Sequence, residues 1–167
     1  AGSSGVEPVG QWNETGVKTL FIKGNTAYLG CNNRLVILDI ADKPNPREIG
    51  EMPVTGDVEA LYVSGDYAYV ADSQGLIEDK GLRIVDVSNP ASPQQVGFFR
   101  SILSQDESGT TYDTIRSVFV SGNLAYVGTG EYFLAANQGT LEVVDISNPA
   151  SPRLKGRSKV NFIKDIY

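Results

Sequence analysis

The side chains that could do chemistry in this chain of 167 residues are mostly carboxylates. It contains 20 Asp and Glu against 14 Lys and Arg, one Cys and no His. Without His, the chain lacks the most common general base and the most common zinc ligand. Its one thiol, Cys31, forms neither an intrachain disulfide nor a multi-thiolate metal site, and we expect a small buried hydrophobe. Calcium binding, or hydrolysis by an acid and a base, is the chemistry that remains.

Carboxylates and aromatic residues gather in three segments, residues 72–80, 101–114 and 129–134. Together they predict an acidic, aromatic-lined patch that suits calcium, a glycan or a cationic protein surface. The alternative is that these segments are ordinary solvated loops. No spacing matches an EF-hand loop and no carboxylate pair stands out as acid and base, so we assign no cofactor, metal or catalytic residue. The candidate binding residues are Asp72, Glu78, Asp79, Asp106, Glu107, Tyr112, Asp113, Glu131, Tyr132 and Phe133.

An internal repeat must position these segments. Residues 35–42, 82–89 and 141–148 read LVILDIAD, LRIVDVSN and LEVVDISN, and each leads into a proline-rich turn. A second unit precedes each of them, in which a Gly-Asn or Gly-Asp turn leads into an Ala-Tyr strand. The repeated aspartates lie 47 and 59 positions apart. Repeats of this length that consist of strands alone are typical of propeller blades.

Each repeat predicts four antiparallel strands, so the fold class is all-β. We expect a β-propeller with three complete blades and one additional strand at each end. A flexible tail, residues 1–5, precedes the propeller segment, residues 6–167. The expected blades cover residues 17–56, 58–114 and 115–162, and the single strands cover residues 6–13 and 163–167.

The spacing also predicts where the three polar segments lie. Connections between the first and second strands, and between the third and fourth, keep constant lengths, whereas the other two connections vary. In an up-and-down blade the variable connections share one end, and binding residues concentrate on such loops. Asp39, Asp86 and Asp145 recur in every blade, so we expect them to accept hydrogen bonds from turn N–H groups.

The repeat resembles the LVIVD-repeat family of β-propeller proteins. The motif is LRIVDVSNPASP at residues 82–93, recurs nearly intact at 141–152 and is degenerate at 35–46, and the resemblance covers residues 6–167. It implies a protein that is exported or attached to the cell surface, and it implies no shared catalytic residues. Because a closed ring normally needs four or more blades, three explanations stay open. The sequence is part of a longer propeller, its ends pair with other subunits, or the chain closes on itself.

The leading hypothesis is a non-catalytic, exported or cell-surface module that binds a protein or glycan or acts as a scaffold. One alternative is a subunit of a ring or filament, which pairs with other copies of itself through its open terminal strands. Another is a secreted hydrolase that acts on polysaccharide through the acidic loops. The net charge of −6 disfavours nucleic acid as a partner, and no apolar stretch is long enough for membrane insertion.

Overall fold

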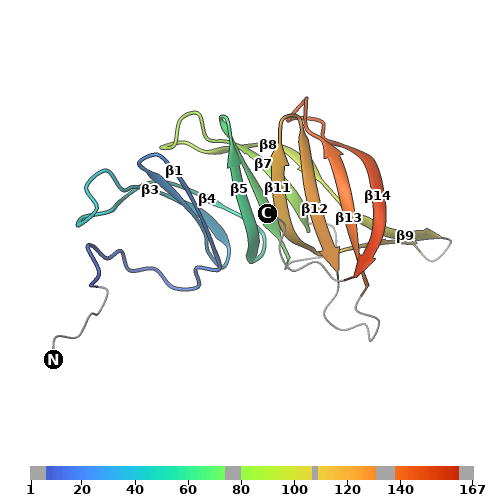
Figure 1. Ribbon diagram of the computed structural model, residues 1–167, viewed down its shortest axis with the longest axis horizontal. Coiled ribbons are helices and arrows are strands. Elements are labelled where there is room, and N and C mark those ends of the chain that lie inside the picture. Colours follow the sequence, from blue (N-terminus) through green and yellow to red (C-terminus); the bar gives the residue numbers. More distant parts are fainter. Residues whose placement is uncertain (1–6, 74–79, 107–108, 131–137, 162–167) are drawn as a thin grey trace.

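The computed structural model describes residues 7–73, 80–106, 109–130 and 138–161, with only the backbone of residues 103–106, 109–112, 138 and 161. These residues contain no helix; they form three four-stranded antiparallel sheets and one two-stranded hairpin (Figure 1). Blade 1 contains β1 (Thr19–Lys23), β2 (Thr26–Gly30), β3 (Arg34–Asp39) and β4 (Arg47–Pro53). Blade 2 contains β5 (Val58–Ser64), β6 (Tyr67–Asp72), β7 (Gly81–Asp86) and β8 (Gln94–Phe99). Blade 3 contains β11 (Ile115–Ser121), β12 (Leu124–Gly130), β13 (Gln138–Asp145) and β14 (Arg153–Asn161).

Tight turns join the first two strands of every blade. Gly24, Gly65 and Gly122 have φ values of 60°, 56° and 56°, a conformation that favours glycine. The turns set the register, so that Phe21 pairs with Tyr28 in blade 1 and the corresponding residues pair in blades 2 and 3. Strand order follows chain order in each blade, as predicted from the repeat.

The repeated aspartates hold the turn between the third and fourth strands. Asp39, Asp86 and Asp145 each accept a hydrogen bond of 2.9 Å from the backbone N–H two residues further on. Hydrogen bonds from the Ser88 hydroxyl and N–H lower the pKa of Asp86, and those from the N–H and hydroxyl of Ser147 lower the pKa of Asp145. Their structural role is confirmed.

Apolar side chains fill the space between neighbouring blades. The innermost strands β1, β5 and β11 lie next to one another, and Figure 1 shows the three sheets side by side in chain order. One core lies between blades 1 and 2 and includes Leu35, Ile37, Leu61 and Val70. A second lies between blades 2 and 3. Both faces of blade 2 are therefore covered, which explains why its strands are apolar at successive positions.

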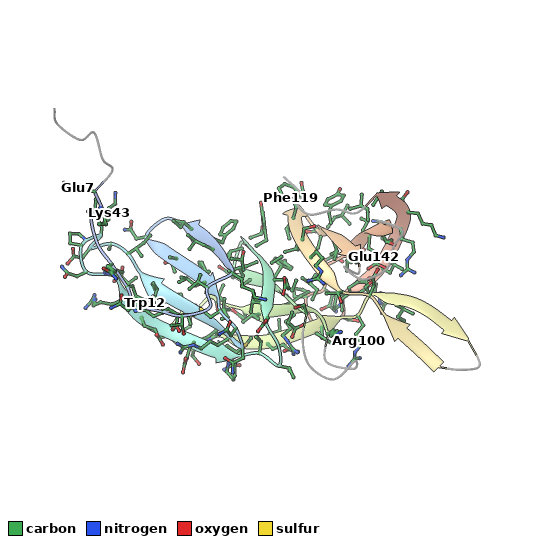
Figure 2. All side chains as sticks on the ribbon, turned by 90° about the horizontal axis from the view of Figure 1, so that it is seen from below. Glu7, Trp12, Lys43, Arg100, Phe119 and Glu142 are labelled. Carbon is green, nitrogen blue, oxygen red and sulfur yellow. The ribbon has the colours of Figure 1, made fainter. Side chains whose placement is uncertain are left out.

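The segment before blade 1 differs from the prediction of a strand over residues 6–13. Its described residues, 7–16, form no strand, because no sheet of the described chain offers them a ladder of partners. Trp12 nevertheless packs against the outer face of blade 1, on a cluster that includes Val36 and the buried thiol Cys31. Figure 2 shows this segment beside blade 1, where Trp12 is labelled. The predicted strand over residues 163–167 lies outside the described residues.

A hairpin interrupts the repeat between blades 2 and 3, where the sequence predicted a loop. It consists of β9 (Ile102–Asp106) and β10 (Gly109–Tyr112), which pair with each other and, within the described ranges, with no strand of a blade. Figures 1 and 2 show it extending beyond the three sheets. At its base, the N–H of Asp113 donates to the Ser101 carbonyl at 2.9 Å, and the Arg157 guanidinium donates to the Ile102 carbonyl at 2.8 Å.

Candidate binding surface at the loop-bearing end

Asp72 and Asp113, the two candidate residues whose side chains are described, lie at one end of the blades, which we call the loop-bearing end. Because neighbouring strands are antiparallel, the second-to-third connection of each blade and the blade-to-blade connections emerge there. The tight glycine turns and the proline-rich turns lie at the opposite, short-turn end. The hairpin β9–β10 is part of a blade-to-blade connection, so it starts from the loop-bearing end.

Asp72 ends β6 inside the protein, with no exposed surface. Its carboxylate accepts hydrogen bonds from the N–H of Gly81 at 2.9 Å and from Arg83 Nε at 2.7 Å. Burial raises the pKa of Asp72, although the charge and hydrogen bond of Arg83 act in the opposite direction. Its partners therefore come from within blade 2, where it ties β6 to β7.

Asp113 is also buried, at 5% exposure, immediately before β11. Its carboxylate accepts a hydrogen bond of 2.9 Å from the N–H of Thr114 and one of 2.5 Å from the hydroxyl of Thr129. These contacts join the end of the hairpin connection to the second strand of blade 3. Asp113 thus fixes where blade 3 begins.

The structure describes only part of the other predicted residues. Asp106 and Tyr112 lie on the two strands of the hairpin, and only their backbone is described. The remaining six lie outside the described residues, namely Glu78, Asp79, Glu107, Glu131, Tyr132 and Phe133. The acidic, aromatic-lined patch that joins all ten residues stays a prediction.

Glu142 is a buried carboxylate that the sequence analysis did not select. Its side chain is 1% exposed on β13 and pairs with Arg157 at 2.5 Å. Burial raises the pKa of Glu142; Ser101 and Arg157 lower it in part, and the nearby Asp113 raises it further. Its second oxygen, Oε2, has no hydrogen-bond partner among the described residues. Figure 2 shows Glu142 within blade 3. The feature of the sequence that could have identified this residue is a Glu inside an otherwise apolar strand.

A second group missed by the sequence analysis joins the first strands of the three blades. Glu59 accepts from Lys18 Nζ at 2.9 Å and from the Ser73 hydroxyl at 2.7 Å, and it lies 3.4 Å from Arg116. Burial acts to raise the pKa of Glu59, but hydrogen bonds from Ser73 and Lys18 and the two positive charges lower it overall. Lys18, Glu59 and Arg116 occupy the same repeat position with alternating charge, a pattern that alignment of the repeats reveals.

Aromatic rings form a row along the same strands. The ring centroids of Phe21 and Tyr62 lie 4.9 Å apart, and those of Tyr62 and Phe119 lie 5.2 Å apart in an edge-on arrangement. Tyr126 extends the row from β12, with its centroid 6.5 Å from that of Phe119. Such pairs stabilise adjoining elements beyond their area burial, so this row connects the three blades along their innermost strands.

The chemistry available in the described part of this end is limited by these pairings. Each carboxylate described above has a cation, an N–H group or a hydroxyl as its partner, and no group of three metal-ligating side chains occurs among the described residues. Two shallow hollows lie at the short-turn end and repeat the same turn residues in blades 2 and 3. Within the described ranges, no helix is long and apolar enough to cross a membrane.

Comparison with known proteins agrees with this architecture. The sheets and turns define an all-β, propeller-like repeat protein. A family model described as "LVIVD repeat" matches residues 16–53, 55–100 and 114–160, and the chain belongs to this family. A search of curated proteins found no match.

Two solved structures share the fold at low sequence identity. The computationally designed Ika4 protein has a TM-score of 0.62 and 15% identity, with 92% of this chain and 79% of that chain covered. A hypothetical selenium-binding protein from Sulfolobus tokodaii has a TM-score of 0.58 and 14% identity, with 81% of this chain and 38% of that chain covered. At these identities the similarity concerns the fold alone.

Proposed function

We propose that this protein is a non-catalytic β-propeller module, exported or attached to the cell surface, that binds a protein or glycan surface through its loop-bearing end. The observation that carries the proposal is the hairpin β9–β10. A two-stranded hairpin that pairs with nothing else is only marginally stable in water. Such an insertion therefore adds little to the stability of the blades, and a contact surface accounts for its presence.

The described carboxylates favour binding over hydrolysis. A glycosidase needs one carboxyl group as acid and a second as base or nucleophile, both facing the substrate. Asp72, Asp113 and Glu142 are instead buried and held by partners of the same blade. The family resemblance supports export or surface attachment, and the net charge of −6 favours a cationic or neutral surface as the partner.

The test replaces residues 103–112 with a two-residue Gly-Asn turn, which leaves the hydrogen bonds of Ser101 and Ile102 in place. Wild type and variant are compared on a glycan array and on immobilised polylysine, a model of a cationic surface. We expect wild type to bind at least one of these surfaces and the variant to lose at least tenfold in affinity. The control, Gln94→Ala at the short-turn end, retains binding. Equal binding by the hairpin variant, or no binding by wild type, contradicts the proposal.

A further inference from the structure

Blade 3 holds both legs of the hairpin β9–β10. The first leg leaves blade 2 after β8, yet the carbonyl of Ile102 accepts a hydrogen bond of 2.8 Å from Arg157 of β14. The hydroxyl of Ser101, a residue that is 2% exposed, donates to the carboxylate of Glu142 on β13. The second leg returns through Asp113, whose N–H donates to the Ser101 carbonyl at 2.9 Å. Because β9 and β10 pair with no blade strand in the described ranges, these contacts at the base determine where the hairpin points.

Arg157 connects the base of the hairpin to a buried charge. Its guanidinium donates from Nη1 to the Ile102 carbonyl at 2.8 Å and from Nη2 to the Glu142 carboxylate at 2.5 Å. The Arg157 side chain is 39% exposed, whereas that of Glu142 is 1% exposed. A planar guanidinium holds its acceptors in fixed directions, so the position of Ile102 depends on how firmly Glu142 holds Arg157. Figure 2 shows Glu142 near the start of the hairpin.

Protonation of Glu142 changes this arrangement at a defined atom. Oε1 accepts the hydrogen bond from Arg157, while Oε2 has no hydrogen-bond partner among the described residues. A proton therefore binds at Oε2. Arg157 then faces a neutral carbonyl oxygen instead of a carboxylate, and the ionic attraction that fixes the guanidinium is lost.

The surroundings of Glu142 favour its protonated form. Burial raises the pKa of Glu142 and the negative charge of Asp113 raises it further, while Ser101 and Arg157 act in the opposite direction. Asp113 comes from the connection before β11, Ser101 from the connection after β8 and Arg157 from β14; on β12, the paired residue is the apolar Val127. An ordinary Glu has a pKa of about 4.3, so Glu142 is more than half protonated at pH 4.

We propose that Glu142 and Arg157 form a clamp that holds the hairpin in one orientation at neutral pH and releases it in acid. The inference rests on the proposed function, because it assigns a regulation to the same binding surface. A clamped hairpin is ordered before it meets its partner, whereas a released hairpin has to be ordered on binding, which costs free energy. Binding through the hairpin is therefore weaker when the clamp is open.

Blade 2 contains a matched ion pair that does not hold the hairpin. Asp72 is buried and pairs with Arg83 at 2.7 Å, as Glu142 pairs with Arg157. Burial raises the pKa of Asp72 as well. Arg83, however, also donates to Gln95 of β8, and not to the base of the hairpin. Replacing Arg83 thus disturbs a buried pair of the same kind and leaves the clamp in place.

The test measures ¹⁵N relaxation order parameters of the full chain at pH 7 and pH 4. A rigid backbone gives about 0.85 and a flexible one less than about 0.6. We expect the amides of β9 and β10 in wild type to match those of the blades at pH 7 and to fall below about 0.6 at pH 4. Glu142→Gln, which resembles the protonated form, should give the low value at both pH values. Arg83→Met, the matched control, should behave as wild type, and the blade amides report whether each variant is folded.

Two outcomes overturn the clamp, namely wild-type hairpin order parameters that are equal at pH 7 and pH 4, or a hairpin in Glu142→Gln that is as rigid as in wild type. Binding to the glycan array and to immobilised polylysine is measured separately at pH 7. There the affinity of Glu142→Gln should fall about threefold to tenfold, roughly the effect of ordering one side chain. Unchanged affinity with a loosened hairpin contradicts the regulation. If the hairpin loosens as expected but wild type binds neither surface, the proposed function fails and the clamp stands.

Discussion

One repeat position in the third strand shows how single residues distinguish the blades. Val36, Arg83 and Glu142 are equivalent residues, and all lie in strands that are otherwise apolar. Val36 is buried in an apolar cluster, Arg83 pairs with the buried Asp72, and Glu142 pairs with Arg157. Burying two charges has a desolvation cost that the attraction between them only partly offsets. We therefore expect these pairs to determine which strands meet more than to add stability.

The raised pKa of Glu142 predicts how its replacement depends on pH. The folded protein holds the Glu142 proton more tightly than the unfolded chain does, so this group costs stability as the pH rises through its folded-state pKa. Gln in its place cannot ionise. As the pH rises from about 4 to 7, the range above an ordinary Glu pKa, the free energy of unfolding of Glu142→Gln should therefore increase relative to that of wild type. Urea unfolding at several pH values measures this difference.

Asp145→Asn is the control, because its free energy of unfolding relative to wild type should change with pH in the opposite direction. Hydrogen bonds lower the pKa of Asp145, so it contributes stability that is present above its unfolded-state pKa and lost as the pH falls. The variant should therefore lose stability relative to wild type as the pH rises toward the ordinary Asp pKa of about 4, and the difference should stay level between pH 4 and pH 7. If both variants show the same trend with pH, the assignment of Glu142 is wrong.

At the scale of the elements, the fourth strand and the following turn form the unit of blade stacking. The strand supplies a glycine and the turn supplies a backbone carbonyl, so the contact depends on backbone position and not on side-chain type. The same arrangement occurs at Gly50 and Gly97, although the connections at the loop-bearing end differ in length, and Gly10, which lies outside any strand, makes the equivalent contact with the Lys43 carbonyl. Stacking and loop length are thus independent.

This arrangement predicts different effects of one substitution at two equivalent positions. Gly97→Ala forces β8 away from the Pro149 carbonyl and should lower the free energy of unfolding by about 1–3 kcal/mol, the usual effect of overpacking. Gly156→Ala meets no described atom and should be neutral or slightly stabilising, because Ala restricts the unfolded chain. Urea unfolding of both variants at a concentration where the chain is monomeric measures the difference. Equal losses would show that strand backbone, and not the turn contact, sets the requirement for glycine.

Much of the element pattern follows from the sequence. The repeat predicts three four-stranded sheets, and the Gly-Asn and Gly-Asp pairs predict their tight turns, because these features depend on residues close in the chain. Asp86 and its counterparts were assigned correctly for the same reason. The hairpin β9–β10 was missed, since its short polar strands lack the apolar pattern that marks a buried strand. Residues 7–13, the described part of the predicted strand over residues 6–13, form no strand, because a strand needs partners that local sequence does not supply.

The candidate site was less predictable, because burial depends on distant partners. Asp72 and Asp113 were selected as loop carboxylates, but the register of β6 with β7 brings Arg83 to one, and the fold of blade 3 brings Thr129 to the other. Glu142 was overlooked because its partner Arg157 is known only once β14 pairs with β13. Aligning the three repeats with one another, however, identifies such unusual residues from the sequence alone.

At the scale of the whole molecule, two inter-blade cores hold the three sheets together. Fully burying a Leu or Ile side chain contributes about 1.5–3 kcal/mol, whereas a surface charge pair contributes about 0–1 kcal/mol. The apolar faces therefore contribute most of the free energy of blade association, and the charges of Lys18, Glu59 and Arg116 contribute a smaller part.

Equivalent leucines on β1 and β5 test this ranking. Leu61→Ala removes a side chain from the core between blades 1 and 2 and should lower the free energy of unfolding by about 2–5 kcal/mol. Leu20→Ala changes an exposed side chain and should stay within about 0.5 kcal/mol in the monomer. The measurement is chemical denaturation at low protein concentration. A large effect of Leu20→Ala in the monomer would mean that the face of blade 1 is already covered.

The separation of short turns from long connections makes the protein a practical display scaffold. Foreign peptides grafted between β6 and β7, or between β12 and β13, enter the chain at the loop-bearing end, whereas Gly50 and Gly97 contact the proline-rich turns of the short-turn end. Several different inserts therefore fit side by side on one molecule, each with its own length, while the sheets beneath keep their spacing.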